Sequence, residues 1–285
     1  MGLVKVALRG WVARLWTALV AVMLLAPMAM AEEPQPWEIG MQPAASPVRE
    51  RIDSLHNELM VIITLITLFV LGLLLYVIVR YNAKRHPTPS QTTHNTLIEL
   101  LWTAVPILIL IAIAIPSFKL LYYTDRAQKV DMTLKVTGHQ WYWSYDYPDQ
   151  GNLSFDSNIV PADQLKPGQE RLLTVDNPVV VPVGATVRVL ITGTDVIHSW
   201  FVPSLGVQKY AVIGRTNETW FKIDKPGTYY GQCNQICGLN HPFMPIEIKA
   251  VSKDDFGKWL GEAKKKFAHD EPQRGALRLA AETAQ

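Results

Sequence analysis

Four side chains able to bind a soft metal ion lie close together near the end of the chain. Cys233 and Cys237 supply two thiolates, His241 an imidazole and Met244 a thioether. This donor set favours copper of the electron-transfer type over a zinc tetrad or an oxygen cage, because a weak thioether ligand is typical of such copper sites. Glycine and proline punctuate residues 231–245, so we predict a ligand loop between strands and not a helix.

A second imidazole is needed to hold copper well, and His198 is the candidate for it. It follows Asp195-Val196-Ile197, at the end of an apolar run that begins at residue 187. If the end of this strand and the ligand loop lie at the same pole of a sandwich, His198 and His241 converge. Two thiolates and two imidazoles exceed the needs of one copper ion of the His₂Cys type, whereas two copper ions with bridging sulfurs would use them all.

The composition excludes several other classes of protein. The chain has 285 residues, 49% of them hydrophobic, a formal net charge of +2 and two cysteines. A charge this small gives no electrostatic case for nucleic-acid binding. Two cysteines cannot form a disulfide scaffold, although a single disulfide between them is the alternative to a metal site in an oxidising compartment.

The first segment resembles an export signal. Residues 1–31 contain basic but no acidic side chains, an apolar run over residues 15–26, and Ala29-Met30-Ala31 at the end. We predict a cleaved signal peptide, with a retained membrane anchor or an organelle transit peptide as alternatives. Residues 32–58 would then be an exported N-terminal segment.

Two uncharged runs, residues 59–79 and 100–118, are each long enough to cross the hydrocarbon core as a helix. We therefore predict a transmembrane hairpin over residues 59–118. Its connector is basic, which places it on the cytoplasmic side and both flanks of the hairpin outside, as a cleaved signal also requires. The basic residues are Arg80, Lys84 and Arg85.

From residue 124 to 268 the chain has the pattern of a β-sandwich with a C-terminal helix. Short runs rich in Val, Ile, Thr, Tyr and Trp alternate with turn residues. Residues 253–267 predict an amphipathic helix, and residues 269–285 a loose polar tail. The predicted strands are residues 130–136, 171–176, 186–191, 219–223, 227–232 and 245–250.

Three motifs together resemble the dinuclear copper A subunit of the haem-copper oxidases, the cytochrome c oxidase subunit II family. They are Gly-Gln-Cys-Asn-Gln-Ile-Cys-Gly at 231–238 with His241 and Met244, Asp-Val-Ile-His-Ser-Trp at 195–200, and Gly-His-Gln-Trp-Tyr-Trp-Ser-Tyr at 138–145. The resemblance covers roughly residues 45–262 and implies a membrane-anchored all-β fold, in which the two-helix hairpin precedes a cupredoxin-like β-sandwich or barrel.

The resemblance also implies a ligand set for two copper ions. Cys233 and Cys237 would bridge the metals, His198 and His241 would each bind one, and Met244 would be a weak ligand. The backbone carbonyl of Gln235 would be the other weak ligand. In the family, residue 235 is usually a glutamate that also binds magnesium where the subunit meets the large catalytic subunit. The neutral amide of Gln235 puts that magnesium ion in question.

Further roles follow from the resemblance alone. Trp141 matches the aromatic residue that receives the electron from cytochrome c, and Glu99 matches a carboxylate at the mouth of a proton pathway. Asp146, Asp176 and Asp195 match an acidic patch that steers the basic cytochrome, which affects encounter rate and salt dependence. Taken individually, these carboxylates are typical of solvated turns and helix ends.

The implied function is that of the electron-entry subunit of an aa3-type, proton-pumping cytochrome c oxidase. Partners would be subunits I and III, cytochrome c and membrane lipid, and oxygen reduction would occur in subunit I. The location would be the bacterial inner membrane with the copper domain on the periplasmic side, in preference to the mitochondrial inner membrane. The alternatives are a copper-delivery module and nitrous oxide reductase, whose similar copper loop accompanies a soluble propeller and no hairpin.

Overall fold

The computed structural model describes residues 31–267, apart from residues 33, 36 and 128. The predicted signal peptide, except for its last residue, and the predicted tail at 269–285 lie outside the described residues.

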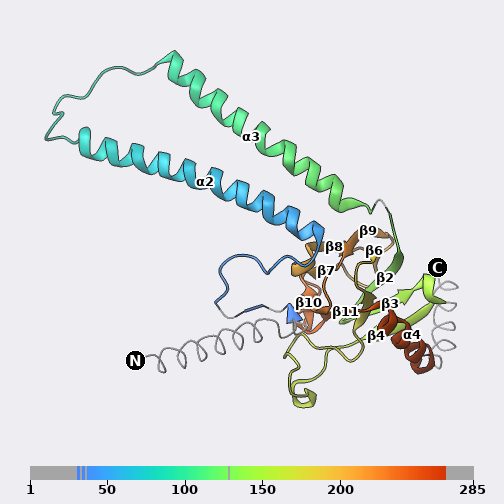
Figure 1. Cartoon of the computed structure of the whole chain (residues 1–285). Helices are drawn as coiled ribbons and strands as arrows, with labels where there is room; N and C mark the ends of the chain where they lie inside the picture. The colour runs from blue at the N-terminus through green and yellow to red at the C-terminus, as the bar shows by residue number, and fades with distance from the viewer. Residues whose placement is uncertain (1–30, 33, 36, 128, 268–285) are drawn as a thin grey trace, which may run out of the picture. The chain divides into compact units, whose positions relative to one another are not determined.

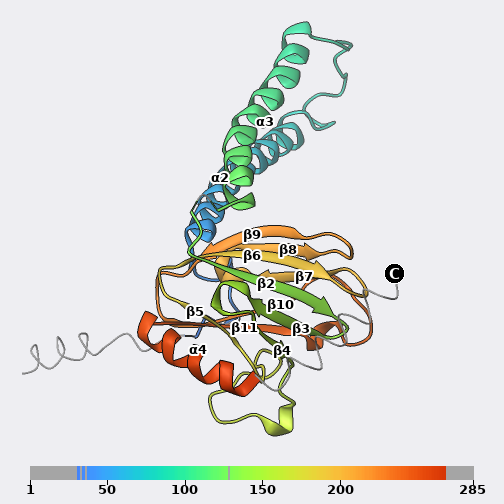
Figure 2. The ribbon, with the colours of Figure 1, turned by 90° about the vertical axis from the view of Figure 1, so that its right-hand side faces the viewer.

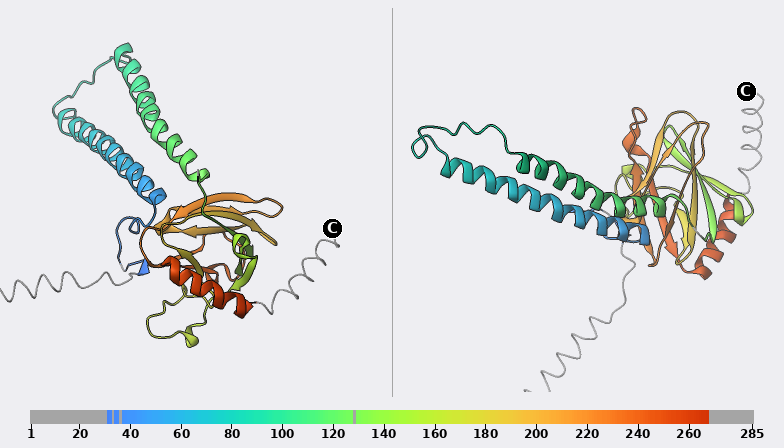
Figure 3. Two further views of the ribbon diagram at one scale, coloured as in Figure 1. Left: turned by 45° about the vertical axis from the view of Figure 1, so that its right-hand side comes forward. Right: turned by 90° about the horizontal axis from the view of Figure 1, so that it is seen from above.

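Two long helices, α2 (Pro47–Arg80) and α3 (Thr96–Asp125), run side by side as an antiparallel hairpin (Figures 1 and 3). Both are longer than the uncharged runs, because each begins at a capping side chain. Ser46 accepts a hydrogen bond from the backbone N–H of Arg49, and Asn95 accepts one from Ile98. Their most apolar windows have mean hydropathies of 3.0 and 2.5, and no residue of either window is buried. By length and composition, both can cross a membrane.

Strands after α3 form two sheets packed face to face (Figure 2). One sheet has the order β5-β11-β10-β7-β8, and the other β4-β3-β2-β6-β9. Neighbouring strands are antiparallel except for the β2/β6 and β5/β11 pairs, which are parallel. This arrangement confirms the predicted sandwich. The strands are β1 (Ala31–Glu32), β2 (Met132–His139), β3 (Tyr142–Tyr147), β4 (Leu153–Ser157), β5 (Val179–Pro182), β6 (Thr186–Gly193), β7 (His198–Val202), β8 (Val207–Ala211), β9 (Asn217–Lys222), β10 (Gly227–Cys233) and β11 (Pro245–Val251).

One predicted strand is wrong. Residues 171–176 form turns, with Leu172 in the left-handed region at φ 69°, and only Val175 makes an isolated bridge, to Ile159. The backbone N–H of Val175 donates instead to the buried carboxylate of Glu247 at 3.0 Å. The Glu247 side chain, from β11, therefore occupies the backbone N–H that Val175 would otherwise offer to a neighbouring strand. The other five predicted strands overlap β2, β6, β9, β10 and β11.

The largest side chains buried between the sheets are aromatic. Trp143, Tyr145, Phe155, Trp200 and Phe221 are fully buried, because inward positions alternate with outward ones along each strand. The predicted C-terminal helix is confirmed as α4 (Lys253–Phe267), and its Trp259 and Phe267 rings pack on the Phe155 ring. Cys233, Cys237 and Met244 belong to the same buried cluster, so the predicted ligand loop is continuous with the core.

Candidate metal centre

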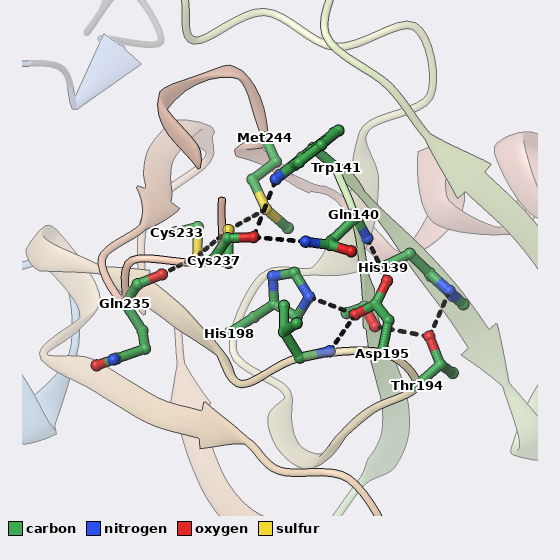
Figure 4. A network of polar contacts seen from close by, with 12 residues as sticks. His139, Gln140, Trp141, Thr194, Asp195, His198, Cys233, Gln235, Cys237 and Met244 are labelled. Atoms are coloured by element: carbon green, nitrogen blue, oxygen red, sulfur yellow. Dashed lines mark hydrogen bonds and ion pairs between the residues drawn. The ribbon is translucent and has the colours of Figure 1, made fainter. Parts of the chain in front are cut away.

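The sulfur ligands predicted from the sequence converge at the end of β10. Cys233 is the last residue of β10, while Cys237 and Met244 lie in the loop that leads to β11. The Cys237 Sγ atom is 3.9 Å from Cys233 Sγ, 3.6 Å from Met244 Sδ and 3.5 Å from His241 Nδ1 (Figure 4 shows the three sulfurs). The backbone carbonyl of Gln235 lies 3.4 Å from Cys233 Sγ. Both cysteines are free thiols. The predicted donors of this loop therefore surround two sulfurs, with His241 and Met244 at Cys237 and the Gln235 carbonyl at Cys233.

Strand pairing brings His198 to the same place. In the β10/β7 pair Cys233 lies opposite Trp200, so His198, at the start of β7, is close to the ligand loop. One ring nitrogen of His198 and the two cysteine sulfurs lie within 4.8 Å of one another. Asp195 Oδ1 holds Nε2 at 2.8 Å, which leaves Nδ1 facing the sulfurs (Figure 4).

The residues present fit a soft metal. The Nδ1 atom of His198 is buried and has no hydrogen-bond partner, although burying an unpaired polar atom costs free energy. A metal bound between this nitrogen and the thiolates would satisfy it. The carboxylate on the other nitrogen fixes the ring and its tautomer, as is usual for metal-bound histidines. Two thiols, a thioether and imidazoles are the donor chemistry of copper.

Two residues of the β2/β3 hairpin shape the wall behind His198. A Cβ atom on Gly138 would lie 2.9 Å from His198 Cδ2 and 3.1 Å from Trp143 Cζ3, so only glycine leaves room for the imidazole. The Trp143 ring meets His198 edge to face at 5.9 Å, and its Nε1–H donates to the Met244 carbonyl at 3.2 Å. The buried indole of Trp143 thus contacts the His198 ring and the backbone of Met244, two of the predicted ligand residues.

The turn between β2 and β3 covers the ligand loop from outside. Trp141, half-buried, donates its indole N–H to the Cys237 carbonyl at 3.2 Å, and the Gln140 side chain donates to the same oxygen at 2.8 Å. The sequence analysis identified Trp141 but missed Gln140, although the same motif contains it. The aromatic predicted to receive an electron is therefore in direct contact with a predicted copper ligand.

The electrostatics of the copper-free centre distinguish the two thiols. Burial opposes ionisation of Cys233, but the facing His198 imidazole, together with the backbone of Ser199 and Gln235 and the Cys237 thiol, holds its pKa below the ordinary value. Burial and the neighbouring Cys233 thiolate raise the pKa of Cys237 to about 12. Burial disfavours the charged forms of His198 and Asp195, yet their contacts raise the pKa of His198 and lower that of Asp195. Cys233 is thus the first thiol to ionise.

Each of the three predicted docking carboxylates has a partner of its own. Asp146, on β3, lies 3.8 Å from the Lys135 ammonium, and Asp176 accepts hydrogen bonds from Asn158. Asp195 contacts His198 Nε2, and the sequence analysis did not predict this contact. The signal that could have indicated it is the spacing, because the carboxylate comes three residues before the histidine.

Two other predicted site residues, Glu99 and Gln235, each make a contact close to their own position in the sequence. Glu99 accepts a hydrogen bond from the Asn95 backbone N–H, which caps the start of α3. The Gln235 side chain points away from the sulfurs, while its carbonyl faces Cys233 (Figure 4).

The fold and the site together define a class: a protein with two membrane-spanning helices, a cupredoxin-like sandwich and a cluster of soft metal ligands at its end. Two family models match the chain. Residues 34–120 match the transmembrane domain of cytochrome c oxidase subunit II, and residues 132–251 match its periplasmic domain. The chain belongs to the cytochrome c oxidase subunit II family, as the motifs predicted.

Similar proteins cover most of the chain. It is 49% identical to a probable cytochrome c oxidase subunit 2 of Rickettsia bellii, over 89% of this chain and 94% of that protein. It is also 49% identical to the mitochondrial cytochrome c oxidase subunit 2 of Vigna unguiculata, over 82% of this chain and 64% of that protein. The crystal structure of the periplasmic domain of subunit II from Bradyrhizobium japonicum is 51% identical, with a TM-score of 0.47, and covers 50% of this chain and 99% of that one.

Proposed function

We propose that this chain is the electron-entry subunit of an aa3-type cytochrome c oxidase. It takes electrons from cytochrome c at a dinuclear copper centre and passes them to haem in subunit I, where oxygen is reduced to water with proton pumping. The observation that carries the proposal is the convergence of one His198 nitrogen with the Cys233 and Cys237 sulfurs within 4.8 Å. His241 and Met244 supply the remaining side-chain ligands, and the Gln235 carbonyl supplies the backbone ligand.

The chain's own residues would keep the centre rigid. Copper ions held by Cys233, Cys237, His198 and His241 would supply one-electron chemistry spread over two metals, so that gaining an electron would change the charge at each set of ligands little. Buried ligands, with Asp195 on one side and Trp143 on the other, resist movement of the donors during transfer. The indole of Trp141 would receive the electron from the cytochrome, since its N–H contacts the Cys237 carbonyl.

The rest of the chain would place this centre in the complex. The hairpin, residues 59–118 in the predicted division, would dock in lipid against subunits I and III, and Glu99 would stand at the mouth of a proton pathway. Asp146, Asp176 and Asp195 would attract the basic cytochrome. The copper domain, residues 124–268, would face the periplasm of a bacterial inner membrane. Magnesium at the interface with subunit I is not part of the proposal, since the Gln235 amide offers a hard cation a neutral oxygen and no charge.

Copper quantitation with electron paramagnetic resonance on the full chain in detergent tests the copper centre. We expect two copper ions per chain and a mixed-valence signal with both metals equivalent. Cys237→Ser should abolish that signal, while the control His94→Ala, at an exposed connector residue, should keep it. One copper ion or none per wild-type chain, or a Cys233–Cys237 disulfide by mass spectrometry, would contradict the proposal.

Electron entry has a separate test. In the assembled oxidase, Trp141→Phe should slow electron transfer from reduced cytochrome c while leaving the copper signal in place, because the indole contacts a backbone carbonyl and not a metal donor. Transfer at the wild-type rate would remove Trp141 from the path.

A further inference from the structure

Gln140 makes two hydrogen bonds to segments that are distant from it in the sequence, and neither bond has a role in the proposed function. It lies in the short turn between β2 (Met132–His139) and β3 (Tyr142–Tyr147), on the same side of the sandwich as the ligand loop (Figure 4). Its backbone N–H donates to Asp195 Oδ2 at 2.6 Å, and its side-chain Nε2 donates to the Cys237 carbonyl at 2.8 Å. One residue therefore bonds both to the segment before β7 and to the loop after β10.

The first bond reaches His198 through one carboxylate. Asp195 accepts from Gln140 with Oδ2, and with Oδ1 it contacts His198 Nε2 at 2.8 Å and the Val196 backbone N–H at 2.6 Å. Charged acceptors make the stronger hydrogen bonds, so this carboxylate is held between the turn and the histidine. Movement of the β2/β3 turn would therefore shift the imidazole.

The second bond reaches the thiol of Cys237 through the backbone of the loop. The Cys237 carbonyl accepts from both Gln140 and Trp141, and the next residue, Gly238, has φ 119°. A Cβ atom on Gly238 would lie 3.0 Å from Trp141 Cζ2 and 3.1 Å from Gln140 Nε2. The turn thus lies directly on the loop, and it fixes the peptide group from which the Cys237 side chain projects.

We propose that Gln140 is a positioning residue of the metal centre, which holds the His198 segment and the Cys237 segment in register with each other. Between them they provide a nitrogen and a sulfur of one cluster. The β7/β10 ladder ends at the Cys233–Trp200 pair and does not extend to Cys237. The inference rests on the proposed function in that these residues are taken as the copper ligands. The side-chain bond to Cys237 can be removed by substitution without touching the backbone bond to Asp195.

The first test needs no metal. Hydrogen exchange is measured by mass spectrometry on the copper-free full chain in detergent, for wild type, Gln140→Ala and Gln140→Glu. The glutamate variant keeps the size of the side chain but cannot donate at neutral pH. Both variants should exchange about threefold to tenfold faster over residues 234–243, as expected for one lost hydrogen bond. Residues 227–232 of β10 should exchange as in wild type.

The second test uses copper-loaded chains and a chelator. Both variants should bind copper, release it about threefold to tenfold faster than wild type, and show altered copper hyperfine splitting. Gln208→Ala, at an exposed residue of β8, is the matched control and should match wild type. Wild-type exchange over residues 234–243 in Gln140→Glu would overturn the inference. If the wild-type chain bound no copper, the proposed function would fail, while the exchange experiment would still decide the role of Gln140.

Discussion

Replacing Gly138 by alanine should disturb His198 directly. The added Cβ atom would lie 2.9 Å from His198 Cδ2 and 3.1 Å from both His198 Cγ and Trp143 Cζ3. Neither ring has room to withdraw, because both side chains are fully buried and the imidazole is held by Asp195. Gly138 is not in the left-handed region, so the effect is steric and not a matter of backbone strain.

The size of the effect follows from these contacts. Inserting a methyl group into a packed core costs about 1–3 kcal/mol. The reduced entropy of the unfolded chain returns about 0.4–1 kcal/mol of this. The difference spans about 0–2.6 kcal/mol. Contacts of 2.9 Å and 3.1 Å with two buried rings place the loss at about 1–2 kcal/mol, which should lower the melting temperature of the copper-free chain by about 2–8 °C. The copper-loaded variant should also show altered coupling to the histidine nitrogen.

Calorimetry of the full chain in detergent, with and without copper, measures this effect. Gly261→Ala is the matched control, since it makes the same change in α4 where nothing lies within 4 Å of the new Cβ atom. Alanine is the better helix former, so this variant should be stabilised by about 0.5–1 kcal/mol. A Gly138→Ala chain with the wild-type melting temperature and copper spectrum would refute the packing argument.

Three further predictions concern the surroundings of the centre. Asp195→Ala should weaken copper binding by about 10- to 100-fold in chelator competition, because it releases the His198 ring; unchanged affinity would argue against this role. Trp143→Phe should cost about 1–3 kcal/mol in denaturant unfolding, since the Met244 carbonyl loses its indole donor and the smaller ring leaves a gap in the buried core. The copper-free chain should lose stability as pH rises from about 8.5 towards 12, because an unfolded cysteine ionises near pH 8.5 whereas the pKa of Cys237 is raised to about 12. Cys237→Ser should flatten this part of the stability profile, and an unchanged profile would disprove the assignment.

Alternation of burial does not by itself decide which strands the sequence predicts, because β3 and β4 alternate as strictly as β6 and, of these three, only β6 is among the predicted strands. The pattern of β6 is a strict alternation of partly and fully buried residues, and its predicted range lay within the observed one. The aromatic strand β3 was noticed only as a motif. Residues 171–176 have β-forming side chains, but Glu247, from β11, takes the Val175 N–H, a contact that local propensity cannot express.

The ligand types could be predicted because donor chemistry belongs to each side chain. Cys233, Cys237 and Met244 were identified as one set by type and spacing, and the structure places their sulfurs in contact distance. The surroundings of those ligands could not be predicted. Gln140 bonds to residues 55 and 97 positions away, and nothing at position 140 indicates which residues the folded sheets will bring to it.

The sequence by itself determined the donor set, the two apolar helices and the family, because composition, period and motif spacing are properties of local segments. Only the tertiary structure decided that Asp195 holds His198, that Gly138 must have no side chain, and that the β2/β3 turn rests on the ligand loop. The physical reason is that hydrogen bonds and steric limits act over a few ångströms between atoms whose separation along the chain carries no such information.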